Sequence, residues 1–217
     1  EVKYRRLHES MTDAFIRVDL AGRIVETNKS FRNMIGYTDE ELFQLTYEEL
    51  TPVKWHAAEE EITRNQALVR GYSDIYEKEY IRKDGSVFPV ELSSFTVRDK
   101  DGKILYLWGV ARDISERKQA EAALRKSEEK HRRLFETMAQ GVVYQTADGH
   151  IYSANPAAEQ ILGISLEQMR NKTSDDTDWD TINEDGSALL GENHPAMRAL
   201  QTGKPIKDFV MGVRNGK

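Results

Sequence analysis

The sequence predicts an α+β fold that occurs twice along the chain, on two observations. Residues 4–42 align with residues 131–169 without a gap, at a constant offset of 127 residues. In the first half, two strand patterns precede several short helices and three more strands, an order typical of an antiparallel sheet with helices packed on it. The offset is far longer than the roughly 20 to 50 residues of a solenoid repeat. We therefore expect two homologous domains, each a five-stranded antiparallel sheet with short helices on one face, the second copy being incomplete.

Each copy opens with a predicted β-hairpin. Its strands are expected at 14–20 and 23–27 in the first copy, and at 141–146 and 150–154 in the second. Gly22 and Gly149 stand in the turn, and a strand–turn–strand pattern of this kind is typical of a hairpin. The same turn residue in both copies supports the alignment.

Two short helices follow each hairpin. The first begins after an N-cap residue, Asn28 or Asn155, and ends where glycine can adopt the left-handed conformation, at Gly36 or Gly163. The second helix begins at a capping box, in which a hydroxyl and a Glu or Gln satisfy each other's backbone donors. The two capping boxes are Thr38 with Glu41, and Ser165 with Gln168.

The first copy then continues with a longer helix and three strands. The helix is expected over 56–69, ending at Gly71, and the strands at 73–82, 87–97 and 104–111. Both alternating faces of the last strand are mostly apolar, so both faces need a cover.

The second copy departs from the first after its second helix. The segment 175–190 is longer and more acidic than its counterpart in the first copy. Asp176, Asp178 and Asp180 have the alternating spacing of a calcium loop, but Thr181 and Ser187 replace its Gly and Glu, so a solvated acidic loop is expected. A helix is expected over 195–201 and a strand over 206–213. No counterpart of the last two strands follows before residue 217.

Composition excludes several function classes. The net charge is −6 and positive and negative residues are mixed, which leaves no basic stripe for nucleic acid. No apolar run approaches the roughly 18 residues of a membrane span, so no membrane contact is expected in this segment. The chain has no cysteine, which excludes disulfides and cysteine-linked chromophores. No phosphate loop, metal-binding helix or nucleophile motif occurs, so we predict no catalytic residue and no metal site.

Several ordered motifs in the first half resemble a PAS sensory domain. The residues that carry the resemblance are Val18-Asp19-Leu20-x-Gly22-x-Ile24-Val25, Asn28-x-x-Phe31, Gly36-Tyr37-x-x-Glu40-Glu41-Leu42, Arg82-Lys83-Asp84-Gly85 and Arg112-Asp113-Ile114-Ser115-Glu116-Arg117-Lys118. The last run resembles the PAC motif that closes the family's domain. The second copy resembles the family more loosely. The resemblance implies a sensory segment of a signalling protein, with a small pocket between sheet and helices that feeds a helix leading to an output domain.

The resemblance also suggests where a ligand would bind. If the family's register holds, Gly109 and Ala111 point into the pocket, while Trp108 lies on the outer face for a helix or a second protomer. The candidate pocket residues are Ile16, Phe31, Ile35, Trp55, His56, Leu105, Leu107, Gly109 and Ala111. For each of them a plain role in the core is the simpler interpretation.

No cofactor is identified from the sequence. Haem bound through His56 stays open, because some PAS domains bind iron through a histidine on the long helix. Against it, His56 stands at the start of that helix, where a partly exposed residue is expected. Flavin held without a covalent bond stays open on similar grounds.

Residues 115–138 contain no Gly or Pro and are rich in helix-forming residues, so they predict one helix between the domains. The resulting division is an N-terminal helix (1–10), a first PAS domain (11–114), a signalling helix (115–138) and a second PAS domain (139–217). The helix carries a weakly apolar seam with a spacing of three and four residues, which favours a marginal coiled-coil dimer able to shift. The seam residues are Arg117, Ala120, Leu124, Ser127, His131, Leu134 and Met138.

The combined prediction is a non-enzymatic, tandem sensory segment of a two-component protein such as a sensor histidine kinase. We expect a cytoplasmic homodimer, within a soluble or membrane-anchored parent, that takes a small-molecule ligand. The signal-coupling candidates are Asp113, Ser115, Leu124 and Leu134. Two alternatives stay open: a ligand-free interaction scaffold, and the input module of a diguanylate cyclase.

Overall fold

The computed structural model describes residues 11–170 and 180–214. The expected N-terminal helix over 1–10 lies outside the described residues. The chain divides into two compact units, Glu1–Ala122 and Ala123–Lys217. None of the described helices is long and apolar enough to cross a bilayer.

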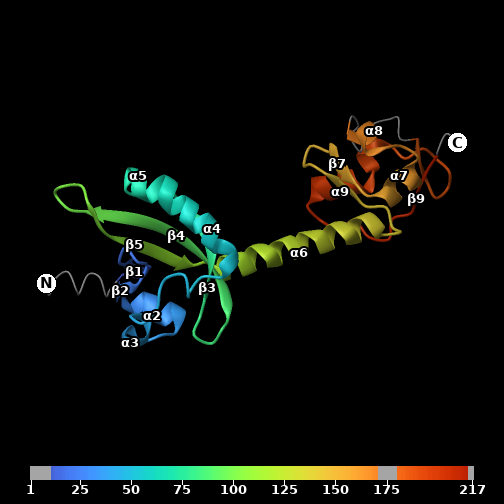
Figure 1. Cartoon of the computed structure of the whole chain (residues 1–217). Coiled ribbons are helices and arrows are strands. Elements are labelled where there is room, and N and C mark those ends of the chain that lie inside the picture. The colour runs from blue at the N-terminus through green and yellow to red at the C-terminus, as the bar shows by residue number, and fades with distance from the viewer. Residues whose placement is uncertain (1–10, 171–179, 215–217) are drawn as a thin grey trace. The chain divides into compact units, whose positions relative to one another are not determined.

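The first unit contains a five-stranded antiparallel sheet in the order β2-β1-β5-β4-β3. The predicted hairpin is present, and the three later strands follow the helices as expected. In Figure 1 the helical run from α4 to α5 lies along one side of this sheet. The strands are β1 (Ala14–Val18), β2 (Ile24–Thr27), β3 (Tyr76–Ile81), β4 (Val87–Arg98) and β5 (Ile104–Asp113).

Local sequence chemistry sets the bounds of the two short helices, α2 (Lys29–Ile35) and α3 (Asp39–Leu42). The Asn28 side chain accepts a hydrogen bond from the Phe31 amide, and Gly36 ends α2 with a φ of 83°. The Thr38–Glu41 capping box is formed as predicted.

The long helix predicted over 56–69 is a composite run. It begins with a 3-10 turn, contains a π-helical segment and ends at Gly71, whose φ is 92°. The π segment was not predicted; a π-bulge inserts one extra residue per turn and often occurs at functional sites. The pieces are η1 (Val53–Trp55), α4 (His56–Ile62), η2 (Thr63–Ala67) and α5 (Leu68–Arg70).

The core of the first unit lies between the sheet and these helices. Phe31, Ile35 and Leu42 are fully buried against Val90 and Leu92 from β4. Burying a side chain of this size stabilises the fold by about 1.5 to 3 kcal/mol relative to exposure.

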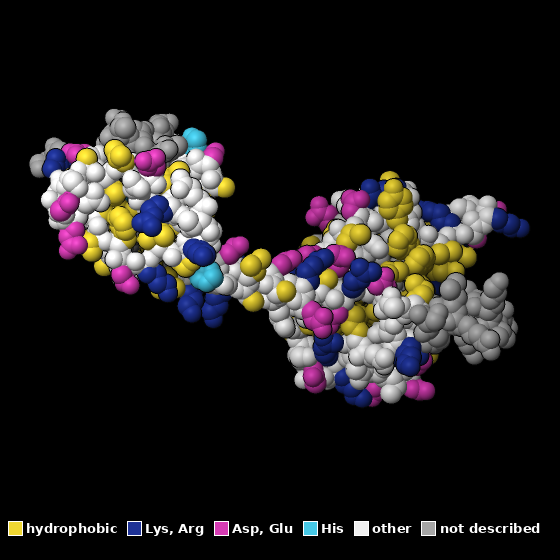
Figure 2. Space-filling view, turned by 180° about the vertical axis from the view of Figure 1, so that it is seen from behind, with side chains coloured by type: hydrophobic (Ala, Val, Ile, Leu, Met, Phe, Trp, Pro, Cys, Tyr) yellow, Lys and Arg dark blue, Asp and Glu magenta, His cyan; other side chains and the backbone are white. Residues whose placement is uncertain are grey.

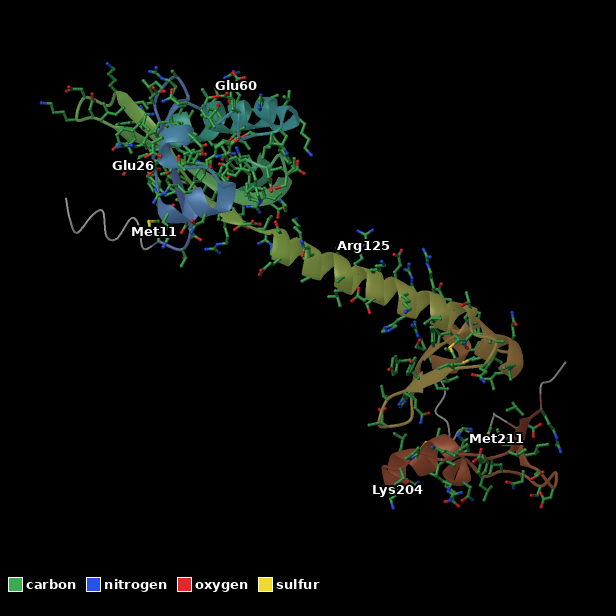
Figure 3. The ribbon with its side chains drawn as sticks, turned by 90° about the horizontal axis from the view of Figure 1, so that it is seen from below. Met11, Glu26, Glu60, Arg125, Lys204 and Met211 are labelled. Carbon is green, nitrogen blue, oxygen red and sulfur yellow. The ribbon has the colours of Figure 1, made fainter. Side chains whose placement is uncertain are left out.

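Helix α6 (Ser115–Thr137) occupies the stretch where the sequence predicts a helix over 115–138. The boundary between the two units falls inside it. None of its residues is buried, and Arg125, labelled in Figure 3, projects from its middle. Its apolar seam is therefore exposed in the single chain.

The second unit repeats the first in its opening elements. The hairpin pairs β6 (Val143–Gln145) with β7 (Ile151–Ala154), and α7 (Pro156–Leu162) and α8 (Leu166–Arg170) follow. Asn155 caps α7 and Gly163 ends it with a φ of 73°, as predicted.

One expectation for the second unit was wrong. The strand expected over 206–213 is confined to β9 (Met211–Val213), because Asp208 takes a φ of 54°, which interrupts extended backbone. A strand that the sequence did not predict, β8 (Thr181–Asn183), pairs with β9. Its three residues are too short for a period-2 pattern to show. The acidic loop expected around Asp176 and Asp178 lies outside the described residues. The remaining elements are η4 (Gly191–Asn193) and α9 (Pro195–Thr202).

Candidate ligand cavity and signal helix

A cavity of about 120 Å³ lies in the first unit between the sheet and the α4–η2 run. Most of its wall is apolar, and a few polar side chains face it from α4, β3 and β4. Its lining includes Ile16, Tyr47, Glu59, Thr63, Tyr80, Leu92, Ser94, Leu107, Trp108 and Gly109. A mostly apolar concavity with a few polar groups is typical of a small-molecule site.

Three of the predicted pocket residues line this cavity: Ile16, Leu107 and Gly109. A Cβ added at Gly109 would lie 3.4 Å from both Ile16 Cγ2 and Leu92 Cδ1. The absence of a side chain at Gly109 therefore helps to keep the space open.

Four predicted pocket residues lie outside the cavity. Phe31, Ile35 and Ala111 are fully buried in the core, where neighbouring side chains fill the space around them. Leu105 is 47% exposed, because it stands beside the β4–β5 turn at the beginning of β5.

Trp55 and His56 also lie outside the cavity. The Trp55 indole donates a hydrogen bond to Glu79 Oε2 at 3.2 Å. The His56 ring nitrogen Nε2 lies 2.9 Å from the Thr51 carbonyl oxygen and 3.2 Å from that of Glu48. Carbonyl oxygens only accept, so Nε2 carries the proton and is occupied as a donor. Among the described residues, no group of three or more His, Asp or Glu is placed to hold a metal ion.

The polar part of the cavity wall was not among the predicted site residues. Glu59 on α4 is buried, and its Oε1 accepts hydrogen bonds from Lys78 Nζ at 2.5 Å and from the Tyr76 hydroxyl at 3.3 Å. Lys78 also donates to Thr51 Oγ1 at 3.0 Å. Its Nζ lies 4.5 Å from the centre of the Tyr80 ring. One buried ion pair thus joins the helical cover to the sheet.

Burial changes the acid–base behaviour of this group. It lowers the pKa of Lys78, and the Glu59 carboxylate opposes that shift. Burial raises the pKa values of Tyr76 and Tyr80, and the charge of Glu59 raises them further. Both phenols therefore keep their protons at neutral pH.

The outer face of the sheet carries an aromatic cluster. The rings of Trp108 and Phe95 stack at 4.4 Å between centroids, and Phe15 lies 5.5 Å from Trp108. Phe15 and Phe95 alternate with the cavity-lining residues Ile16 and Ser94, so their side chains belong to the opposite face. Trp108, which contacts both rings, is also among the residues that line the cavity. Figure 2 shows apolar side chains gathered on one face of the first unit.

The start of α6 is fixed to the same sheet. Asp113 Oδ1 accepts the Ser115 amide at 2.8 Å, and Asp113 Oδ2 pairs with Arg82 at 2.8 Å. Arg117 on the first turn of α6 pairs with Glu77 of β3 and Glu91 of β4, both at 3.0 Å. The helix therefore begins in direct contact with two of the strands that flank the cavity.

The other two coupling candidates lie further along α6. Leu124 is 62% exposed and Leu134 is 53% exposed. Neither is covered by the described part of the chain, so both are free to contact another molecule.

The second unit contains a larger cavity of about 370 Å³. Its wall is mostly apolar, with His194 among its few polar members, and its lining includes Val143, Ile151, Leu162 and Val213. Burial lowers the pKa of His194, so the neutral imidazole is favoured.

Two family models, each described as a PAS domain, match this chain. One covers residues 12–116 and the other residues 129–195. The chain belongs to the PAS domain family. Its two units are a first and a second PAS domain in tandem, and the sheet with its helical cover is the fold of that family.

Proteins with sensory or signalling names are among its relatives. The chain is 31% identical over 124 residues to the protein named Probable diguanylate cyclase DgcE of Escherichia coli (strain K12), covering 56% of this chain and 11% of that protein. It is 27% identical over 129 residues to the sensor histidine kinase TmoS of Ectopseudomonas mendocina, covering 57% of this chain and 13% of that protein. The chain thus spans about a tenth to an eighth of these relatives.

A solved structure supports the fold. The structure titled an RNA-binding light-oxygen-voltage receptor is similar with a TM-score of 0.50 and 21% identity, covering 59% of this chain and 37% of that one. At this identity the likeness concerns the fold alone.

Proposed function

We propose that this chain is the sensory input segment of a signal-transduction protein. In this proposal the first PAS domain binds a small molecule, and α6 carries the resulting change toward an output domain. The observation that carries it is the position of the cavity: β3 and β4 line or flank it and also hold the first turn of α6 through Glu77 and Glu91.

The proposed route is short. Lys78 faces inward to Glu59, while its neighbour Glu77 on the same strand pairs with Arg117 of α6. A ligand that shifts Glu59 or Lys78 would move β3 and therefore the anchor of α6. In this proposal β3 and the first turn of α6 have two arrangements, and the ligand favours one of them, as signal transfer requires.

The output domain we propose is a histidine kinase, with a diguanylate cyclase as the alternative. The named relatives include both, and the family resemblance applies equally to the two. We propose no catalytic role for the segment itself, and we place the segment in the cytoplasm, within a soluble or membrane-anchored parent.

We also propose that the segment forms a homodimer through α6. Leu124 and Leu134 are exposed on this helix, and Met138 is exposed directly after its last residue. A seam with so few apolar side chains would give a weak coiled coil, which suits a helix that changes its packing. The division into domains at 11–114, 115–138 and 139–217 belongs to the same proposal.

Native mass spectrometry of the freshly purified chain tests the sensory proposal. A small molecule retained by the chain, and lost after cavity-filling substitution at Gly109, would support sensing. An empty, dimeric chain whose properties do not respond to any small molecule would instead support the ligand-free interaction scaffold.

A further inference from the structure

One oxygen of Glu59 is a buried acceptor to which no described residue donates a hydrogen bond. Oε1 is occupied by Lys78 and Tyr76, whereas Oε2 is buried and has no hydrogen-bond partner among the described residues. Glu59 itself is only 7% exposed. Leaving a buried polar group unpaired costs about 1 to 3 kcal/mol, and more when the group is charged.

The cavity is the place from which a donor can reach this carboxylate. Glu59 lines the cavity with Ser94 on one side, while Ile16, Leu92 and Leu107 make an apolar wall. A water molecule there would need two to four polar partners; Tyr47, Thr63 and Ser94 line the cavity beside Glu59, but most of the lining surface is apolar. A molecule with one donor and an otherwise apolar body matches the wall better.

The size and charge of the site narrow the ligand class. A dry cavity of about 150 Å³ holds one benzene ring. This cavity measures about 120 Å³, so its size limits the ligand to a single ring. Lys78 already neutralises Glu59 at 2.5 Å, so a charged ligand would bring an unpaired charge into the interior. The site therefore favours an uncharged molecule.

We propose that the cavity of the first PAS domain binds an uncharged one-ring ligand that donates an O–H or N–H hydrogen bond to Glu59 Oε2. This inference rests on the proposed sensory function and specifies the chemistry of its ligand. Glu59 is then the residue that determines specificity, and Lys78 and Tyr76 position its carboxylate.

Two probes of similar shape test it: phenol, which has a donor, and fluorobenzene, which has none. Binding of each to the whole chain is measured by isothermal titration calorimetry. We expect phenol to bind about 10 to 100 times more tightly, the range for a hydrogen bond to a charged acceptor. In Glu59→Gln the amide oxygen accepts from Lys78 and the amide nitrogen faces the cavity, so the preference should fall below about threefold.

Matched variants separate specificity from loss of the fold. Glu60→Gln changes the next glutamate of α4, which is exposed and points outward in Figure 3, and should keep the wild-type preference. Glu59→Gln combined with Lys78→Met leaves no unpaired charge, and the Tyr76 hydroxyl still donates to the amide oxygen, so this variant should also lose the preference. Circular dichroism checks that each variant is folded.

Equal binding of phenol and fluorobenzene to the wild-type chain would overturn the inference and leave the sensory proposal intact. A phenol preference that survives in both Glu59 variants would overturn it as well. If neither probe binds, the inference is wrong; the sensory proposal fails with it only if native mass spectrometry also finds an empty chain that responds to no small molecule.

Discussion

Lys78 on β3 and Glu59 on α4 form an ion pair across the core of the first PAS domain, with Nζ 2.5 Å from Oε1 and side-chain exposures of 1% and 8%. Removing one partner of such a pair leaves the other charge buried and uncompensated. We expect Lys78→Met to lower the free energy of unfolding by about 3 to 5 kcal/mol, measured by urea denaturation.

The exposed pair between Glu60 and Arg64 on the same helical run is the control. Glu60→Gln should change the free energy of unfolding by less than about 1 kcal/mol, because exposed ion pairs contribute little. Equal effects of the two substitutions would mean that the Lys78–Glu59 pair is not buried as described.

Alkaline pH should destabilise the domain through its buried tyrosines. The folded-state pKa of Tyr76 is raised above its ordinary value of 10.0, first by burial and then by the Glu59 charge. The folded state therefore holds a proton that the unfolded state loses, so this stabilisation is complete below pH 10 and declines as the pH rises further. The denaturation midpoint should fall above pH 10, and it should fall less in Tyr76→Phe. Tyr152→Phe, at an exposed site, is the control; identical pH profiles for both variants would contradict the prediction.

Part of this architecture could be predicted from the sequence because it depends on local chemistry. The capping box of Thr38 and Glu41 involves residues three apart, and Gly36 ends α2 by its own conformational freedom. Strand alternation likewise predicts that Ile16, Leu107 and Gly109 line the cavity, and they do, whereas Trp108, expected on the outer face, is also among the lining residues. Such features need no knowledge of distant contacts.

The polar wall of the cavity could not be predicted in the same way. Glu59 and Lys78 are 19 residues apart and look like surface residues of a helix and a strand. The sequence held one signal for the lysine: Lys78 lies two residues from both Tyr76 and Tyr80, so its side chain is on the same apolar face of β3 as theirs. A lysine on such a face requires a buried acceptor, but its identity depends on how α4 crosses the sheet.

Haem should not bind through His56. Its Nε2 donates to the Thr51 carbonyl oxygen at 2.9 Å, and the ring does not line the cavity. After incubation of the apoprotein with haem, we expect the same weak absorbance for the wild-type chain and His56→Ala. A stoichiometric Soret band that disappears in His56→Ala would contradict this.

Filling the cavity should abolish ligand binding. Gly109→Leu adds a side chain where even a Cβ lies 3.4 Å from Ile16 and Leu92. We expect a loss of about 1 to 3 kcal/mol in the free energy of unfolding from overpacking, together with loss of the bound mass. Val110→Leu changes the next residue of β5, on the other face of the sheet, and should keep the free energy of unfolding and the bound mass unchanged. An unchanged melting temperature and unchanged binding in Gly109→Leu would place Gly109 outside the ligand-binding cavity.

The central claim is that α6 transmits the signal as a continuous helix whose first turn is fixed to the sheet. Each inserted residue rotates everything beyond it by about 100°, so seven residues restore the helical face and four nearly do so. The most direct measurement is the output of the full-length parent with one, two, four or seven residues inserted after Ala122. We predict an output that follows helical phase, with seven residues closest to wild type and two furthest from it. An output that changes smoothly with length, or does not change, would contradict the account and reduce α6 to a tether.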